Sequence, residues 1–115
     1  MGWRRLFIGG LIAGAALLAA NQAQAQEQGI LVTEVIGPIT PAVALHLESA
    51  VESAAEANSL LLVLVDTPGG LDVSTRQIVQ GFLNAPVPVV AYVHPSGARA
   101  ASAGTFIVMS AHVAA

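Results

Sequence analysis

Apolar runs typical of β-strands alternate with segments of helical spacing from residue 30 to the end of the chain. The runs at 30–35, 60–65 and 87–93 are rich in aliphatic and β-branched residues, and they predict three strands. The run at 60–65 is continuously apolar, which predicts a strand buried on both faces of a parallel sheet. Residues 112–115 resemble the start of a fourth strand.

The segments between these runs predict helices. Thr40 followed by Pro41 is typical of a helix start, with threonine as cap and proline at the first helical position. The helix at 41–57 has an apolar face made of Ala44, Leu47, Val51 and Ala54. A second helix, capped within residues 72–75 and running to Asn84, is expected to point Ile78, Val79, Phe82 and Leu83 inward. A third follows Ser102 and is expected to be buried at 106–109. The pattern predicts an α/β domain, a parallel β-sheet covered by right-handed crossover helices.

The first 25 residues have a different character. Arg4 and Arg5 are followed by an uncharged apolar run at 6–20 and by the small-x-small triplet Ala23-Gln24-Ala25. This order is typical of a secretory signal peptide cleaved after Ala25, and an uncleaved N-terminal membrane anchor is the alternative. We therefore expect a signal peptide at 1–25 and the folded domain at 26–115.

Composition narrows the function classes. The net charge is −3 and no basic cluster is present, which argues against nucleic acid binding. The chain has no cysteine, and its four basic residues are all arginine, so it also has no lysine. Glu48, Glu52 and Glu56 follow one another at i, i+4 spacing, which favours a solvated helix face over a metal site. We expect neither a metal nor a cofactor.

Two strand ends carry the candidate chemistry. One is the turn Asp66-Thr67-Pro68-Gly69-Gly70, and the other leads into Ser102 at a predicted helix start. Ligand sites of open parallel sheets lie beyond the carboxyl ends of the strands, so these segments are expected to face one cleft. Ser102 would be a nucleophile, with the amides of Gly70 and Ala103 as oxyanion donors. The alternative is that Ser102 only caps the helix.

Gly69 and Gly70 are expected to bind substrate, because glycine lets a substrate approach the backbone closely. We expect Gly70 in particular to need a positive φ and to leave room for substrate. Four neighbouring residues are weaker candidates: His94 as a substitute base, Arg99 as a loop-ordering or substrate contact, Ser96 as a competing nucleophile, and Asp66 as a turn residue. His46 on the first predicted helix is interpreted as structural.

The turn at 66–70 together with Gly97-Ala98-Arg99-Ala100-Ala101-Ser102-Ala103-Gly104-Thr105 resembles the motifs of ClpP/crotonase-like serine peptidases. The resemblance extends over residues 29–115 and is closest to the NfeD-type membrane-bound proteases, which are often paired with stomatin-like proteins. It implies a Ser–Lys dyad in which Ser102 is the nucleophile and Gly70 and Ala103 donate to the oxyanion. It also implies hydrophobic segments of membrane proteins as substrates, a homo-oligomer, and a place on the periplasmic side of a bacterial inner membrane.

The chain departs from that family in one respect, because it has no lysine to act as the base. The family's lysine lies some tens of residues after the serine, so the chain is expected to be the N-terminal part of the protease domain, incomplete at its C-terminus and inactive alone. Two alternatives remain. One is a non-catalytic scaffold that binds membrane or stomatin-like proteins, and the other is a crotonase-like enzyme acting on a thioester.

Overall fold

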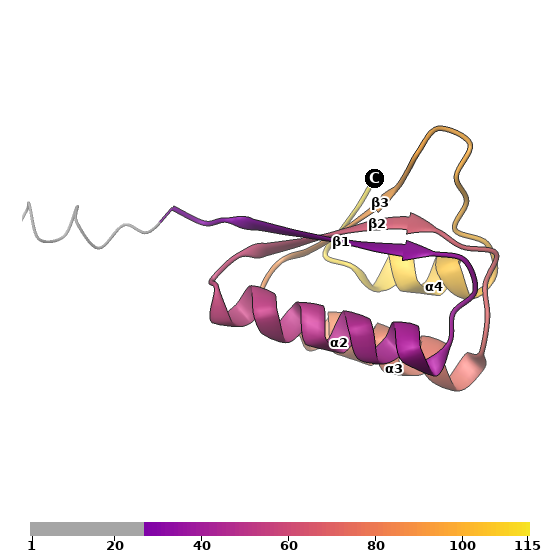
Figure 1. Cartoon of the computed structure of the whole chain (residues 1–115), viewed down its shortest axis with the longest axis horizontal. Helices are drawn as coiled ribbons and strands as arrows, with labels where there is room; N and C mark the ends of the chain where they lie inside the picture. Colours follow the sequence, from indigo (N-terminus) through magenta and orange to yellow (C-terminus); the bar gives the residue numbers. More distant parts are fainter. Residues whose placement is uncertain (1–26) are drawn as a thin grey trace, which may run out of the picture.

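The computed structural model describes residues 27–115, in which strands and helices alternate (Figure 1). The strands are β1 (Ile30–Ile36), β2 (Leu60–Asp66), β3 (Val89–Val93) and β4 (Val113–Ala114). The helices are α2 (Pro41–Glu56), α3 (Asp72–Leu83) and α4 (Ala103–Ser110). The predicted order of elements is confirmed, whereas the predicted signal peptide lies outside the described residues. Within this part of the chain, no helix is both long and apolar enough to cross a membrane.

All neighbouring strands are parallel, and the sheet order is β1-β2-β3-β4. Right-handed crossovers between strands that follow one another in space place every helix on the same face, and Figure 1 shows all three helices on one side of the sheet. The prediction that β2 is buried on both faces is therefore wrong. Its buried and half-buried residues alternate, with Leu61, Val63 and Val65 fully buried under the helices.

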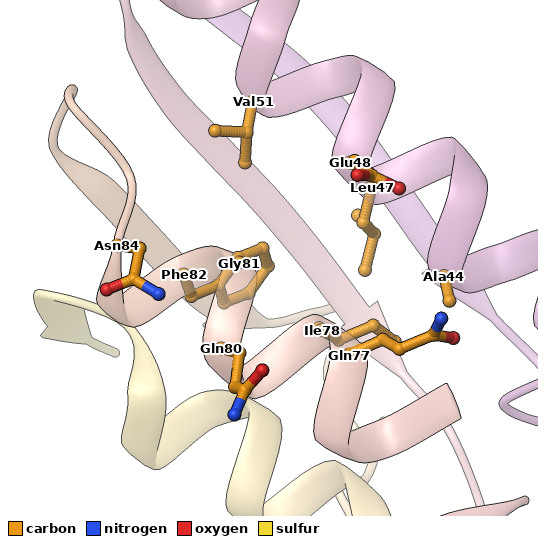
Figure 2. Close-up of a pocket in the computed structure, with 10 residues that line it drawn as sticks. All are labelled: Ala44, Leu47, Glu48, Val51, Gln77, Ile78, Gln80, Gly81, Phe82 and Asn84. Carbon is orange, nitrogen blue, oxygen red and sulfur yellow. The ribbon is translucent and has the colours of Figure 1, made fainter. Parts of the chain in front are cut away.

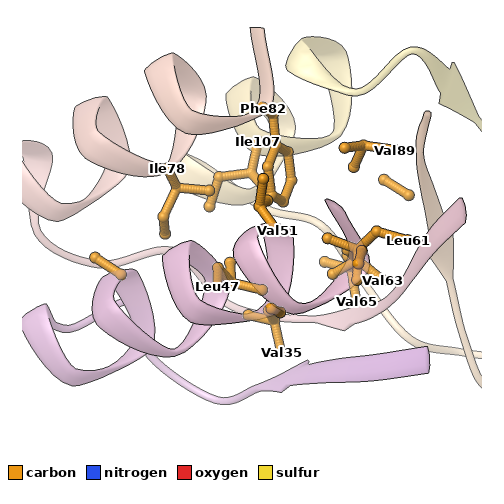
Figure 3. Packing of buried hydrophobic residues seen from close by; sticks show 14 of the residues in the cluster. Val35, Leu47, Val51, Leu61, Val63, Val65, Ile78, Phe82, Val89 and Ile107 are labelled. Atoms are coloured by element: carbon orange, nitrogen blue, oxygen red, sulfur yellow. The ribbon is translucent and has the colours of Figure 1, made fainter. Parts of the chain in front are cut away.

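The core lies between the sheet and the three helices (Figure 3). Leu47 from α2, Phe82 from α3 and Ile107 from α4 are each at most 1% exposed. They pack in one cluster with sheet residues such as Val35 and Leu61. Full burial of one such side chain stabilises a fold by roughly 1.5–3 kcal/mol, so this single layer of contacts holds the domain together.

Helix α2 begins as predicted. The Thr40 hydroxyl accepts a hydrogen bond from the Val43 amide at 3.3 Å, and Pro41 occupies the first turn. The predicted apolar face is buried, and the three glutamates are exposed. His46 Nε2 lies 2.7 Å from the Thr33 hydroxyl on β1, so the histidine has the structural role expected of it.

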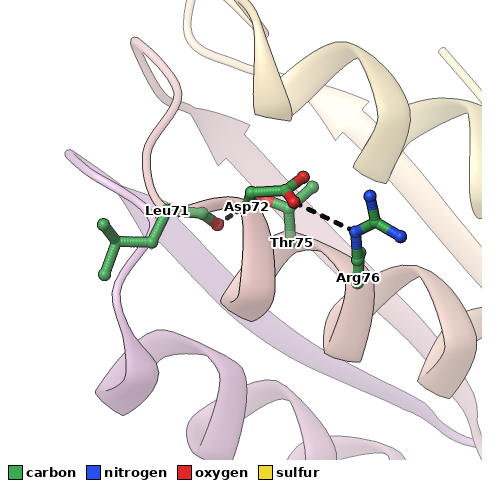
Figure 4. A network of polar contacts seen from close by, with 4 residues as sticks. All are labelled: Leu71, Asp72, Thr75 and Arg76. Carbon is green, nitrogen blue, oxygen red and sulfur yellow. Dashed lines mark hydrogen bonds and ion pairs between the residues drawn. The ribbon is translucent and has the colours of Figure 1, made fainter.

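Helix α3 begins directly after the double glycine, with Leu71 as its cap residue and no side-chain capping bond. The expectation of a cap within residues 72–75 is therefore wrong. Figure 4 shows what stabilises the first turn instead: the Thr75 hydroxyl donates to the Leu71 carbonyl at 2.8 Å, and Arg76 Nε pairs with Asp72 Oδ2 at 3.1 Å. The ion pair is exposed and contributes little, since solvent screens it. The Thr75 bond fixes the chain where it leaves the glycine turn.

Two expectations about helix faces are corrected. On α3, Leu83 is 64% exposed and Val79 is half-buried, although both were expected to point inward. On α4, Phe106 and Met109 are 63% and 74% exposed, and only every third or fourth residue faces the sheet. Each helix covers the sheet from one side, so half of its surface stays in solvent.

Candidate functional site

The site lies where β2 and β3 end. The two strands pair as far as Val65 and Val93, and their pairing resumes at an isolated parallel bridge between Thr67 and Ala100. Residues 94–99 lie between these two points and form a loop that projects from the sheet before α4 (orange in Figure 1). The bridge places the glycine turn beside the segment that leads into Ser102, as expected from the carboxyl ends of neighbouring parallel strands.

Ser102 has an unusual backbone conformation. Its φ is 51° and its ψ is −115°, and among the described residues only Asn58 is another non-glycine residue with positive φ. Such a conformation costs on the order of 1–3 kcal/mol and persists only where surrounding contacts fix it. The residue is exposed and immediately precedes α4, but its hydroxyl makes no capping bond. Ser102 therefore occupies the N-cap position of α4, but its side chain does not cap the helix.

Gly69 lies directly against Ser102. An added Cβ on Gly69 would lie 2.8 Å from the Ser102 Cβ and 3.3 Å from its Oγ, and the φ of Gly69 is +112°. A side chain at this position would displace the serine and strain the backbone. Because Gly69 has no side chain, the Ser102 side chain can occupy the space beside it.

Gly70 was expected to need a positive φ. This expectation is wrong, because Gly69 and not Gly70 has the positive φ. An added Cβ on Gly70 would collide with the backbone of Ile39, on the side of β1, and not with a substrate in front of Ser102. The Ile39 amide donates to the Gly69 carbonyl at 2.9 Å, and the Leu71 amide donates to the Ile39 carbonyl at 3.0 Å. In this parallel pairing, the Gly70 amide points away from Ile39.

Two backbone amides, those of the residues that follow Gly69 and Ser102, have no hydrogen-bond partner among the described residues. Among residues 27–115, neither the Gly70 N–H nor the Ala103 N–H donates to a protein oxygen. Ala103 is the first residue of α4, where helix amides have no partner and carry a partial positive charge. An exposed hydroxyl beside free amides has the chemical elements of an acyl-transfer site.

The other candidates are not linked to Ser102. The exposed His94 packs its ring against Tyr92, with centroids 5.4 Å apart, and within the described chain it makes no hydrogen bond to the serine. Asp66 was expected in a turn but is the last residue of β2, and its Oδ1 accepts the Arg99 amide at 3.2 Å. Arg99 is exposed, and Ser96 lies exposed in the projecting loop.

Sequence reasoning missed two threonines. Thr67 is a polar residue with no exposed surface, and it contacts both halves of the site. The Thr105 hydroxyl donates to the Ala100 carbonyl at 2.9 Å and so ties the first turn of α4 to the bridge. Thr67 was identified only as part of a turn motif; its place directly after a buried strand was the available signal.

Two cavities among the described residues lie away from Ser102. A cavity of about 280 Å³ lies between α2 and α3, where Figure 2 shows Leu47 and Glu48 facing Ile78 and Gln77. A larger groove of about 650 Å³ lies between α3 and α4 and includes Phe106. None of Gly69, Gly70, Ser102 and Ala103 lines either one.

The arrangement defines an α/β domain of ClpP-like fold. ClpP1 from Listeria monocytogenes superposes with a TM-score of 0.55 at 20% identity, over 70% of this chain and 46% of that chain, which shows likeness of fold alone. The fold class expected from the sequence is confirmed. No protein-family model matches the chain.

The chain is homologous to the 1510-N membrane-bound stomatin-specific protease, and the expected resemblance is thereby confirmed. A serine-to-alanine mutant of that protein superposes with a TM-score of 0.75 at 31% identity, over 77% of this chain and 44% of that chain. A lysine-to-alanine mutant in complex with a substrate peptide gives 0.74 at 32% identity, with 76% and 41% covered. The membrane-bound protease PH1510 of Pyrococcus horikoshii is 44% identical over 55 residues. The chain thus spans less than half of each solved homologue and 12% of the curated relative.

Proposed function

We propose that this chain carries the nucleophile and the oxyanion-binding amides of a membrane-associated serine endopeptidase. Ser102 is the nucleophile, Gly70 and Ala103 donate to the oxyanion, and Gly69 gives the serine room. The observation that carries the proposal is the conformation of Ser102. Its φ is 51°, and its exposed side chain makes no capping hydrogen bond at the start of α4, beside Gly69. A serine needed only as a cap would have neither that strain nor a free hydroxyl.

In the proposed reaction, Ser102 Oγ attacks the carbonyl carbon of a peptide bond while a general base takes the hydroxyl proton. The carbonyl oxygen becomes negative and receives hydrogen bonds from the amides of Gly70 and Ala103. The carbon–nitrogen bond then breaks, the amine leaves with the proton, and water hydrolyses the resulting ester to restore the serine. A single oxyanion donor is worth on the order of a hundredfold to a thousandfold in turnover in a characterised serine protease.

The base is proposed to be a lysine, as in a Ser–Lys dyad. All four basic residues of the chain are arginine, and a guanidinium stays protonated and cannot accept the proton. The lysine must therefore come from outside these 115 residues. Part of the support is the homologue, since a lysine mutant of 1510-N was captured with a substrate peptide.

The proposed substrate is a hydrophobic segment of a membrane protein, with a stomatin-like protein as the first to test. The support is the homologue, which is described as membrane-bound and stomatin-specific. We further propose that the protein acts on the periplasmic side of a bacterial inner membrane as a homo-oligomer. Export is tested by N-terminal sequencing of protein recovered from membranes: a start near Gln26 supports a cleaved signal peptide, and an intact Met1 shows an anchor.

The nucleophile is tested by replacing Ser102 with alanine in the product of the complete gene. We expect Ser102→Ala to abolish cleavage of a hydrophobic stomatin-like peptide and to leave the thermal melt unchanged, because alanine fits a site already surrounded by small residues. Ser96→Ala in the projecting loop is the matched control and should cleave at the parent rate. A folded Ser102→Ala protein that still cleaves would contradict the proposal.

Because the chain has no lysine, the scaffold alternative remains open, and the same experiment tests it. A scaffold would bind the stomatin-like peptide without cleaving it, and Ser102→Ala would not change that binding. Robust Ser102-dependent cleavage by the 115-residue chain alone would instead overturn the lysine assignment and point to His94.

A further inference from the structure

Thr67 occupies the point at which the two halves of the site meet. It lies between the end of β2 and the double glycine, and it has no exposed surface. A buried hydroxyl must find partners, because an unsatisfied polar group in the interior is costly. The partners of Thr67 show what the residue does.

The hydroxyl of Thr67 organises the glycine turn. Oγ1 donates to the Gly37 carbonyl at 2.7 Å and accepts the Gly69 amide at 3.1 Å. Gly37 follows β1, so the hydroxyl joins the end of that strand to the glycine that lies against Ser102. It thereby fixes the peptide that precedes the Gly70 amide.

The rest of Thr67 supports the serine segment. Its amide donates to the Arg99 carbonyl at 2.7 Å, and its carbonyl accepts the Ala101 amide at 3.0 Å. Its methyl group packs under the first turn of α4, where an added Cβ on Gly104 would lie 2.6 Å from Thr67 Cγ2. One residue therefore contacts the segments that carry both oxyanion donors.

We propose that Thr67 is a positioning residue that sets the Gly70 amide relative to Ser102 and the Ala103 amide. This inference rests on the proposed function for its catalytic meaning. The hydroxyl holds the glycine turn, and the methyl group holds the first turn of α4. Thr67 acts through its neighbours and does not touch the substrate.

Two variants separate these contributions. Thr67→Val keeps the shape and removes the hydroxyl, whereas Thr67→Ser keeps the hydroxyl and removes the methyl group. The readouts are the amide resonances of Gly69, Gly70 and residues 101–103 in ¹⁵N-labelled protein, and the affinity for a peptide boronic acid. A boronic acid forms a tetrahedral adduct on a serine hydroxyl and places an oxygen at the oxyanion donors. Thermal melts define the fraction that is folded.

We expect folded Thr67→Val, which loses the hydroxyl, to shift the resonances of Gly69 and Gly70 and to bind the boronic acid at least about tenfold more weakly. Thr67→Ser, which loses the methyl group, should instead shift the resonances of residues 101–103. Unchanged resonances and affinity in folded Thr67→Val would overturn the inference. So would a shift confined to Gly69, since the hydroxyl would then be only a local turn contact.

A third variant decides the question if Thr67→Val does not fold. Gly104→Ala introduces a methyl group against Thr67 Cγ2, and Thr67→Ser removes that obstacle. We expect Gly104→Ala to weaken boronic acid binding and the double variant to restore it, whereas no restoration would contradict the inference. If the parent does not bind the boronic acid, the proposed function fails, and the resonance shifts alone decide whether Thr67 positions the two segments.

Discussion

At the scale of single residues, the two adjacent glycines have different roles. Gly69 faces Ser102, whereas Gly70 faces Ile39 and turns its amide the other way. Both orientations follow from one parallel bridge, which pairs Gly70 with Ile39 just after β1. The motif identified both glycines from the sequence, but it could not show which one the serine contacts, because that depends on the direction of each backbone bond.

The Gly69 contact leads to a prediction about Gly69→Ala. The added methyl group would lie 2.8 Å from the Ser102 Cβ, and the φ of +112° disfavours any side chain, so we expect Ser102 to be displaced and cleavage to be lost. Gly97→Ala is the control, because Gly97 also has a positive φ of +88° but nothing lies near its added Cβ. Both variants should lose stability, by about 1–2 kcal/mol from backbone strain alone. Melts and peptide cleavage are measured together, and full activity of Gly69→Ala would contradict the assigned contact.

At the scale of elements, the strands and helices were predictable from the sequence, whereas their exposed sides were not. Apolar runs and a threonine–proline start gave β2 and α2 within one or two residues, because local hydrogen bonding and capping determine such elements. Phe106 and Leu83 were expected in the core because they are apolar. Whether an apolar side chain is covered depends on the layers around the sheet, and one sequence does not contain that information.

Helix α3 provides a prediction about stability. Gly81 lies near its C-terminal end beside the cavity between α2 and α3, and nothing lies within 4 Å of an added Cβ (Figure 2). Gly81→Ala should raise the free energy of unfolding by about 0.5–1 kcal/mol, since alanine favours the helix and meets no obstacle. Gly104→Ala on α4 is the matched substitution with the opposite sign, because its methyl group meets Thr67. Denaturant unfolding measures both, and a destabilised Gly81→Ala protein would contradict the prediction.

At the scale of the whole molecule, the described residues 27–115 form a sheet with one face covered by helices and one face that none of their helices covers. The helices bury Val35 on β1, whereas Ile30, Val32 and Ile36 on the same strand are 55–69% exposed. The open face continues through the half-buried side chains of β2 to Tyr92 on β3, which is 42% exposed. Residues along β1 and β2 alternate between more and less buried, as expected of a sheet covered on one face. The sequence of β2 is nevertheless apolar at every position before Asp66. Within residues 27–115, this continuously apolar strand is therefore covered by helices on one face only.

The face of the sheet opposite the helices leads to a prediction about self-association of the protein. We expect the purified protein to self-associate through this face, because exposed apolar side chains drive association in water. The exposed Glu34 lies in the same row of β1, between Val32 and Ile36, and is the one charge in that row. Val32→Thr should reduce it, since threonine is polar but suits a strand, and the free energy of unfolding should change by no more than about 0.5 kcal/mol. Val35→Thr is the same substitution on the opposite face of the same strand. It places a hydroxyl in the core and should cost roughly 1–3 kcal/mol without reducing association. Sedimentation velocity over a range of concentrations, below the melting temperature, distinguishes the two variants. Equal association of the parent and the Val32→Thr protein would show that this face is not the surface through which the molecules meet.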